Sequence, residues 1–308
     1  MRTVIGITGT TSVGKSAVGV ELAILLRSEV ISADSMQIYK GMDIGTAKIT
    51  PCEMRGVKHY MLDVAEPDEN FSSFLYQQQA SQIIDNMATI PIIVGGTGFY
   101  FDSLIYPPEF GSVGDVRRTE LKRILDEQGI AALRKILKDL DFDAYSRVDL
   151  DNPKRVLRAI EIAESGGKLS DGVGRNAEPK YDFKLFVLER SRDNLYKQID
   201  VRVDEMIEKG LVEEVSRLVN KYGVCDTSAF QAIGYKEIIG YLSGAYPLDE
   251  AIEKIKLNTR HYAKRQITYF KKMNVFEFIN VEDKTSHEIA VHIANTINFN
   301  GINGNIQN

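Results

Sequence analysis

An eight-residue segment near the start of the chain, Gly9–Ser16, matches the phosphate-binding pattern G-x-x-x-x-G-K-[ST] at every required position. Glycines let backbone N–H groups close round a phosphate, and the lysine neutralises further phosphate charge. The final serine hydroxyl is a suitable Mg²⁺ ligand, so Ser16 is the expected metal-binding residue. Phosphate binding is therefore expected from Gly9, Thr10, Thr11, Ser12, Val13, Gly14, Lys15 and Ser16. The pattern fits ATP, GTP or any pyrophosphate ester.

The residues on either side of this loop have the periodicity that a phosphate-binding loop requires. Residues 3–8 form a short β-branched run that predicts a buried strand, and residues 17–26 carry apolar side chains at helical spacing. The N-terminus of such a helix adds partial positive charge beside a bound phosphate. A strand, a phosphate loop and a helix are therefore expected in that order.

Two further polar segments come directly after predicted strands. Asp34 follows a strand expected at residues 29–32, and Thr97 lies among glycines after a strand expected at residues 91–94. In a parallel α/β sheet the carboxyl ends of the strands form the edge where ligands bind. Asp34 is suited to holding a ribose hydroxyl, binding magnesium through water, accepting a proton, or capping a turn. Thr97 offers a hydroxyl to an oxyanion.

Between these segments lies a polar, glycine-containing stretch at residues 40–51, which shows neither a helical nor a strand period. It fits a flexible lid or substrate loop and an ordinary surface connection equally well. Asp63 ends the next apolar run and is either a metal-binding carboxylate or a surface residue.

Composition limits the class of protein. A chain of 308 residues with 44% hydrophobic residues can form one large or two ordinary domains. The net charge of −5 argues against nonspecific coating of nucleic acid but allows a local basic face. The two cysteines have no metal-ligand spacing and suit a reducing compartment. No segment approaches the roughly 20 apolar residues of a membrane span, so we expect a cytoplasmic protein without membrane contact.

The order of the predicted elements indicates an α/β fold with a P-loop parallel sheet. Residues 1–110 and 181–297 are expected to form this core, with a helical C-terminal part. Residues 111–180 lack strand-like runs and predict a helical insertion between the strands. Residues 298–308 are rich in Asn and Gly and predict a flexible tail.

Basic residues gather on two predicted helices. Lys154 and Arg158 share a helical face, next to Arg155. Residues 254–272 contain seven Lys and Arg and no acid, with apolar side chains on one side. Each cluster fits an ordinary solvated face or a surface that contacts a phosphate backbone.

Taken together, the segments at residues 9–16, 34–48 and 95–98 resemble the bacterial tRNA dimethylallyltransferases. Residues 200–203, 231–237 and 259–268 are similar to later motifs of that family in order and spacing, so the resemblance covers about residues 4–272. The chain has Thr10, Tyr269 and Lys271 where the family usually has proline, tryptophan and arginine. The last two keep an aromatic and a cation, although Lys lacks the bidentate geometry of Arg.

The resemblance implies transfer of a dimethylallyl group from dimethylallyl diphosphate to N6 of the adenosine just 3′ of the tRNA anticodon, with Mg²⁺. Asp34 would accept the amine proton, while Thr97 and Arg202 would help the phosphate loop to stabilise the departing diphosphate. The residues expected to contact the tRNA anticodon stem-loop are Asp34, Ser35, Met36, Gln37, Thr97, Lys154, Arg155, Arg158, Gly234, Tyr235, Arg260, Lys264, Arg265, Gln266 and Lys271. The protein is expected to act as a monomer.

Three other functions fit parts of the sequence. A small-molecule phosphotransferase of the nucleoside-kinase type would share the loop and the sheet but leaves the basic helix unexplained. A prenyltransferase acting on free AMP would need no tRNA-sized basic surface. A noncatalytic RNA-binding protein that uses nucleotide as a switch would give Asp34 no particular task.

Overall fold

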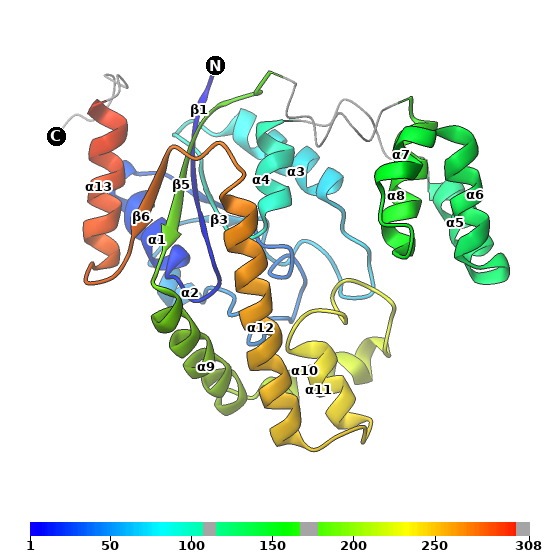
Figure 1. Cartoon of the computed structure of the whole chain (residues 1–308). Coiled ribbons are helices and arrows are strands. Elements are labelled where there is room, and N and C mark those ends of the chain that lie inside the picture. Colours follow the sequence, from blue (N-terminus) through cyan, green and yellow to red (C-terminus); the bar gives the residue numbers. More distant parts are fainter. Residues whose placement is uncertain (107–114, 167–177, 300–308) are drawn as a thin grey trace. The chain divides into compact units, whose positions relative to one another are not determined.

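The computed structural model describes residues 1–106, 115–166 and 178–299. The chain divides into two compact units, one formed by Met1–Phe101 with Tyr181–Asn308 and the other by Asp102–Lys180. The first unit contains a parallel six-stranded sheet with strand order β3-β2-β4-β1-β5-β6 (Figure 1). Its strands are β1 (Thr3–Gly9), β2 (Val30–Ser32), β3 (His59–Tyr60), β4 (Ile92–Val94), β5 (Asp182–Glu189) and β6 (Glu277–Asn280). The predicted α/β fold with a parallel sheet is confirmed.

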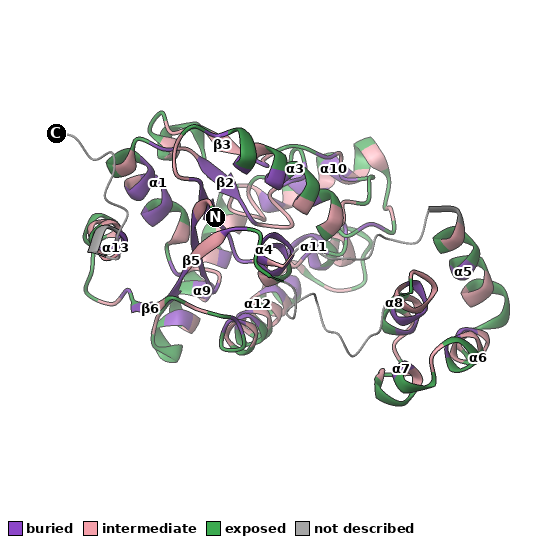
Figure 2. Cartoon of the chain, turned by 90° about the horizontal axis from the view of Figure 1, so that it is seen from above, coloured by how far each residue is buried: buried purple, intermediate pink, exposed green. Residues whose placement is uncertain are grey.

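The central strand β1 is buried on both faces because strands and helices surround it. Ile5 pairs with Ile92 of β4 on one side and with Lys184 of β5 on the other. Ile5 and Ile7 are fully buried, as the apolar run at the start of the sequence predicts for a parallel strand. Buried residues are concentrated on the strands and on the helix faces that cover them (Figure 2).

Two hydrophobic clusters hold the first unit together. One joins the sheet to α1 and α13 through residues such as Ile7, Val18 and Ile293. The other joins residues 38–42 to α10, α11 and α12, with Val215 and Ile255 at its centre. The helices of this unit, together with α4, which ends in the second unit, are α1 (Lys15–Leu26), α2 (Pro51–Met54), α3 (Ser73–Asn86), α4 (Gly98–Ile105), α9 (Arg192–Glu208), α10 (Leu211–Tyr222), α11 (Tyr235–Leu242), α12 (Leu248–Phe270) and α13 (Ser286–Phe299).

The second unit contains helices around a small core of its own. Leu121, Leu133, Leu137, Val156 and Ile160 are fully buried in it. This separate core explains why the unit is compact by itself. Its own helices are α5 (Asp115–Gln128), α6 (Ile130–Leu140), α7 (Phe142–Arg147) and α8 (Pro153–Glu164). The unit begins at Asp102, within α4, whereas the predicted insertion begins at residue 111.

The sequence interpretation missed several elements. It did not predict β6, α11 or α13, and β3 is only two residues long within the apolar run that was expected there. α13 ends at Phe299, so the first two residues of the predicted tail are helical, and residues 300–308 lie outside the described residues. Within the part of the chain that the structure describes, no helix is long and apolar enough to cross a membrane.

Candidate active site

The strand order brings three distant segments together at the carboxyl edge of the sheet. β4 lies between β1 and β2, so the segments that follow these three strands are neighbours. The Ala33 N–H donates to Val94 O at 2.7 Å, and the Thr97 N–H donates to Ala33 O at 3.1 Å. A Cβ on Gly95 would lie 2.1 Å from Ala33 O, so only glycine permits this close approach. The small residues at this edge therefore let the two segments meet.

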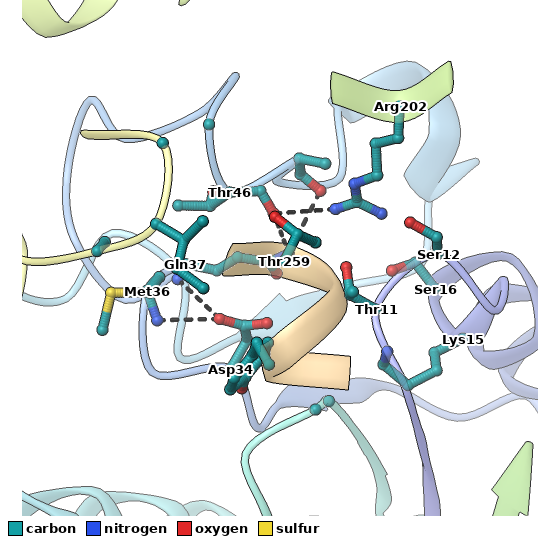
Figure 3. A pocket seen from close by; sticks show the side chains of 18 of the residues that line it. Thr11, Ser12, Lys15, Ser16, Asp34, Met36, Gln37, Thr46, Arg202 and Thr259 are labelled. Carbon is teal, nitrogen blue, oxygen red and sulfur yellow. Dashed lines mark hydrogen bonds between the residues drawn. The ribbon is translucent and has the colours of Figure 1, made fainter. Parts of the chain in front are cut away.

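A cavity of about 740 Å³ opens beside these segments, with walls from α1, α9, α11, α12 and the loops at the sheet edge. In Figure 3, Lys15, Ser12 and Ser16 lie on one side of it, Asp34 lies on another, and the Arg202 guanidinium points between them. The predicted site residues that line this cavity are Thr11, Ser12, Gly14, Lys15, Ser16, Asp34, Ser35, Met36, Gln37, Arg202, Gly234, Tyr235, Arg265 and Gln266.

Lys15 and Arg202 are two of the cations that face the cavity. Lys15 Nζ donates to Thr10 O at 2.6 Å. Desolvation lowers the pKa of Lys15 to about 8; the negative charge of Asp34 opposes this shift, and the positive charge of Arg202 adds to it. Arg202 Nη2 donates to Thr46 O at 3.4 Å, and desolvation also lowers the Arg202 pKa, again opposed by Asp34. Both cations are therefore short of compensating negative charge. An anion in the cavity would provide it.

Asp34 is held by a turn of its own backbone. Its Oδ1 accepts from the N–H groups of Met36, at 2.9 Å, and Gln37, at 3.4 Å. This is the turn-capping role that the sequence left open. Its Oδ2 accepts no hydrogen bond from the described residues, and the residue is only half-buried. One carboxylate oxygen is thus fixed while the other remains available to a ligand.

Thr97 lies next to Asp34 but does not line the cavity. Its Oγ1 accepts from the Ser35 N–H at 3.0 Å and donates to Ser35 Oγ at 3.2 Å. Burial raises the pKa of Tyr262 on α12, and the negative charge of Asp34 raises this pKa further. Hydrogen bonds with Thr97 and Gln266 offset part of the increase. Tyr262 thus joins α12 to this part of the site. The sequence interpretation did not select Tyr262 as a site residue. Its signals there are its place within residues 259–268, which resemble a family motif, and its i, i+4 spacing from Gln266.

Gln266 connects α12 to two of the sheet-edge segments. Its Oε1 accepts from the Thr11 N–H at 3.0 Å, and its Nε2 donates to Gly96 O at 2.8 Å. Both the oxygen and the nitrogen of this buried amide therefore bind groups of the protein itself. Tyr235 is also buried, and its hydroxyl donates to Glu214 at 2.6 Å. Direct tRNA contacts by Gln266 and Tyr235 stay predictions.

Two cations of α12, Lys256 and Arg260, have acidic partners on α9, which the local sequence does not show. Arg260 contacts Asp200 through Nε, at 3.1 Å, and Nη2, at 2.6 Å, from Asp200 Oδ1. Lys256 Nζ lies 2.7 Å from Asp204 Oδ1. The acid-free stretch at residues 254–272 is therefore not uniformly basic in the folded protein. The predicted tRNA-contacting residues of this stretch that are exposed are Lys264, Arg265 and Lys271.

The other predicted basic cluster lies in the second unit. Lys154, Arg155 and Arg158 line a shallow cavity of about 410 Å³ together with Arg147. Arg155 pairs with Asp149 at 3.2 Å, and Arg158 pairs with Glu161 at 3.1 Å. The Arg155 and Arg158 side chains nevertheless remain 65% and 52% exposed, so they are accessible to a polyanion.

The fold and the site define an α/β protein with a parallel sheet and a cavity at the sheet edge that Lys15, Arg202 and Asp34 line. A model of the IPP transferase family matches residues 37–273. A tRNA dimethylallyltransferase from Clostridioides difficile is 42% identical over 302 residues, which cover 94% of this chain and 97% of the relative. The chain belongs to the IPP transferase family, which confirms the resemblance carried by the sequence motifs.

Solved structures agree with this assignment. A tRNA delta(2)-isopentenylpyrophosphate transferase from Staphylococcus epidermidis is 37% identical, with a TM-score of 0.73, over 98% of this chain and 100% of that one. A eukaryotic dimethylallyltransferase acting on tRNA is 28% identical, with a TM-score of 0.82, over 97% of this chain and 80% of that one.

Proposed function

We propose that this chain transfers a dimethylallyl group from dimethylallyl diphosphate to N6 of the adenosine 3′-adjacent to the anticodon in tRNA. The main support for this proposal is that Lys15 and Arg202 face the same cavity as the available oxygen of Asp34. The cavity therefore combines groups that stabilise a leaving diphosphate with a group that accepts a proton. Membership of the family selects prenyl transfer to tRNA among the reactions that need such groups.

The diphosphate of the donor binds at the phosphate loop. Backbone N–H groups of residues 12–16, the N-terminus of α1, and the side chains of Lys15 and Arg202 hold its oxygens. When the bond between the allylic carbon and oxygen breaks, the electron pair stays on the diphosphate. The two desolvated cations stabilise this developing charge without reorganising.

The acceptor adenine enters on the side of Asp34. Its N6 attacks the allylic carbon, and Asp34 Oδ2 accepts the proton that N6 loses as the new bond forms. The turn that fixes Oδ1 orients the carboxylate for this transfer. The adenine has to leave the stacked anticodon loop to reach the cavity, as bases do in other enzymes that modify them.

Magnesium fits this site as an ion held largely by the substrate. Ser16 is the exposed second residue of α1 and lines the cavity. The described residues contain no group of three or more His, Cys, Asp or Glu side chains. Mg²⁺ keeps several waters and binds readily through phosphate oxygens, so one hydroxyl and the diphosphate suit it. It would supply further neutralisation of the leaving group. Asp63 pairs with Lys48 at 2.6 Å and does not line the cavity.

Exposed basic residues on each unit are the proposed contacts with the tRNA backbone. In the first unit these are Lys264, Arg265 and Lys271, and in the second they are Lys154, Arg155 and Arg158. Such contacts position a nucleic acid without reading its sequence. We further propose that the protein acts as a monomer in the cytoplasm, where its tRNA substrate is found.

The proposal is tested by incubating the purified protein and Mg²⁺ with dimethylallyl diphosphate labelled in the prenyl group. Separate reactions contain tRNA, AMP, or a nucleoside with ATP. We expect label in tRNA alone, at N6 of the adenosine beside the anticodon. Label in AMP would indicate a free-nucleotide prenyltransferase, and phosphorylated nucleoside would indicate a kinase; either result without labelled tRNA refutes the proposal.

A further inference from the structure

One buried carboxylate has no part in the chemistry described above. Glu214 lies in the first turn of α10 and is 1% exposed. Its Oε2 accepts from the N–H groups of Asp43, at 3.0 Å, and Ile44, at 2.8 Å. Its Oε1 accepts from the Gly45 N–H at 3.1 Å and from the Tyr235 hydroxyl at 2.6 Å. Four donors from two separate parts of the chain thus converge on one side chain.

The partners of Glu214 are hydrogen-bond donors rather than cations. No Lys or Arg forms an ion pair with this carboxylate within the described residues. A buried charge of this kind is tolerated when hydrogen bonds fill its acceptor sites. Burial, and then the charge of Glu214, raise the pKa of Tyr235 well above its ordinary value, which keeps the phenol protonated and donating. The arrangement is suited to holding three consecutive N–H groups in place.

The held segment forms part of the cavity wall. Gly45, which Glu214 binds, lines the cavity together with the next two residues, Thr46 and Ala47. The Thr46 carbonyl accepts from Arg202 Nη2 at 3.4 Å and from Gln37 Nε2 at 3.3 Å (Figure 3). One backbone carbonyl therefore contacts both a cation of the donor site and the residue whose N–H binds Asp34.

The segment is also closely seated against its surroundings. A Cβ on Gly45 would lie 2.6 Å from the Tyr235 ring and 2.9 Å from Leu211 Cδ1. The packing leaves no space for a shift toward α10 or α11. Glu214 and this packing together favour a fixed wall over a flexible lid, the two alternatives that the sequence allows for residues 40–51.

We infer that Glu214 is a positioning residue for the transfer reaction. By binding the N–H groups of residues 43–45, it fixes the Thr46 carbonyl, and this carbonyl orients Arg202 toward the departing diphosphate and Gln37 beside Asp34. The inference rests on the proposed function, because the rate that tests it is the rate of prenyl transfer to tRNA. The chemical requirement is a side chain with two acceptor oxygens, because an amide would point its NH₂ group at a donor.

The test compares Glu214→Gln with two controls from the same helix. Glu213→Gln removes the same charge from an exposed neighbour, and Val215→Ala reduces packing in the adjacent core without touching the carboxylate. In Glu214→Gln we expect kcat per folded molecule, at saturating donor and tRNA, to fall about 10- to 100-fold, the range for a displaced catalytic group. The tRNA dissociation constant should change less than about twofold, because no tRNA contact is removed.

Hydrogen exchange gives a readout that does not depend on activity. The amides of residues 43–45 should exchange faster in Glu214→Gln than in the wild type, and at the wild-type rate in Glu213→Gln. Val215→Ala should lower the melting temperature but keep kcat per folded molecule. A kcat within about twofold of wild type in Glu214→Gln, or an equal loss in Val215→Ala, would overturn the inference.

Two further results keep the test decisive. If Glu214→Gln does not fold, Tyr235→Phe removes one donor of the four, and it should lower kcat in the same direction by a smaller factor; an unchanged kcat would count against the inference. If the wild type transfers no prenyl group to tRNA, the proposed function fails by itself. The exchange of residues 43–45 then still decides whether Glu214 holds this segment, and unchanged exchange refutes that role.

Discussion

Replacing Asp34 with asparagine separates basicity from shape. Asparagine keeps Oδ1, which accepts from the Met36 N–H at 2.9 Å and the Gln37 N–H at 3.4 Å, so the turn is retained. The oxygen that is lost is Oδ2, which the described residues leave available. Because each retained hydrogen bond is worth only about 0.5–1.5 kcal/mol, the free energy of unfolding should change little. Any large effect of Asp34→Asn must then come from chemistry in the cavity.

The size of the rate loss distinguishes the two possible roles of Asp34, which are to accept a proton and to cap a turn. A general base contributes about 10²- to 10⁴-fold in rate. This corresponds to about 3–5 kcal/mol of activation free energy. A slightly altered turn would cost about 1 kcal/mol, or less than about tenfold in rate. We therefore expect Asp34→Asn to lower the single-turnover rate at least 100-fold if Asp34 accepts the proton.

The assay is single-turnover prenyl transfer at saturating tRNA, dimethylallyl diphosphate and Mg²⁺, with donor and tRNA affinities measured separately. Asp63→Asn is a matched control, because Asp63 pairs with Lys48 and does not line the cavity. A rate within about threefold of wild type would remove Asp34 from the proton transfer. Weakened donor binding that recovers at high Mg²⁺ would instead assign Asp34 to the metal.

Three further outcomes are expected. Lys15→Ala should abolish turnover and weaken donor binding while tRNA binding is kept. Separate titrations with donor and with tRNA measure the two affinities, and an equal loss of tRNA binding would contradict the prediction. Because the Lys15 pKa is lowered to about 8, donor affinity should fall as the pH rises from 8 to 9, and this fall should disappear in Lys15→Ala. Replacing Lys264 and Lys271 with Gln should flatten the salt dependence of tRNA binding by up to about two units of log–log slope, whereas solvated side chains would leave it unchanged.

The parts of the fold that the sequence predicts well are those determined by local patterns. β1, α1 and β4 follow from apolar runs and helical periods, and their observed bounds agree within two residues of those expected. The position of Asp34 at the sheet edge follows because it comes directly after β2. In these segments the local sequence and the final contacts favour the same structure.

β6 was missed because its local signal is weak. It is a four-residue strand at the edge of the sheet, and Ile279 is its one buried residue. Its partner is β5, where Phe278 pairs with Val187. So short a segment has too few residues to show a period, and pairing with a strand 90 residues earlier supplies what the local pattern lacks. α13 packs on α1, whose residues lie near the other end of the chain.

Residue type indicates what a side chain can bind, but the fold decides which partner it meets. Arg260 was predicted to contact phosphate, and in the folded chain its guanidinium binds Asp200 of another helix. Glu214 is one of two adjacent glutamates, and only it lies buried against the N–H groups of residues 43–45. The first contact spans 60 residues and the second about 170. Most of the groups proposed for catalysis come from the first half of the chain, whereas Glu214 and Gln266, on helices of the second half, bind the segments beside them. The proposed reaction would therefore depend on contacts that no local motif encodes.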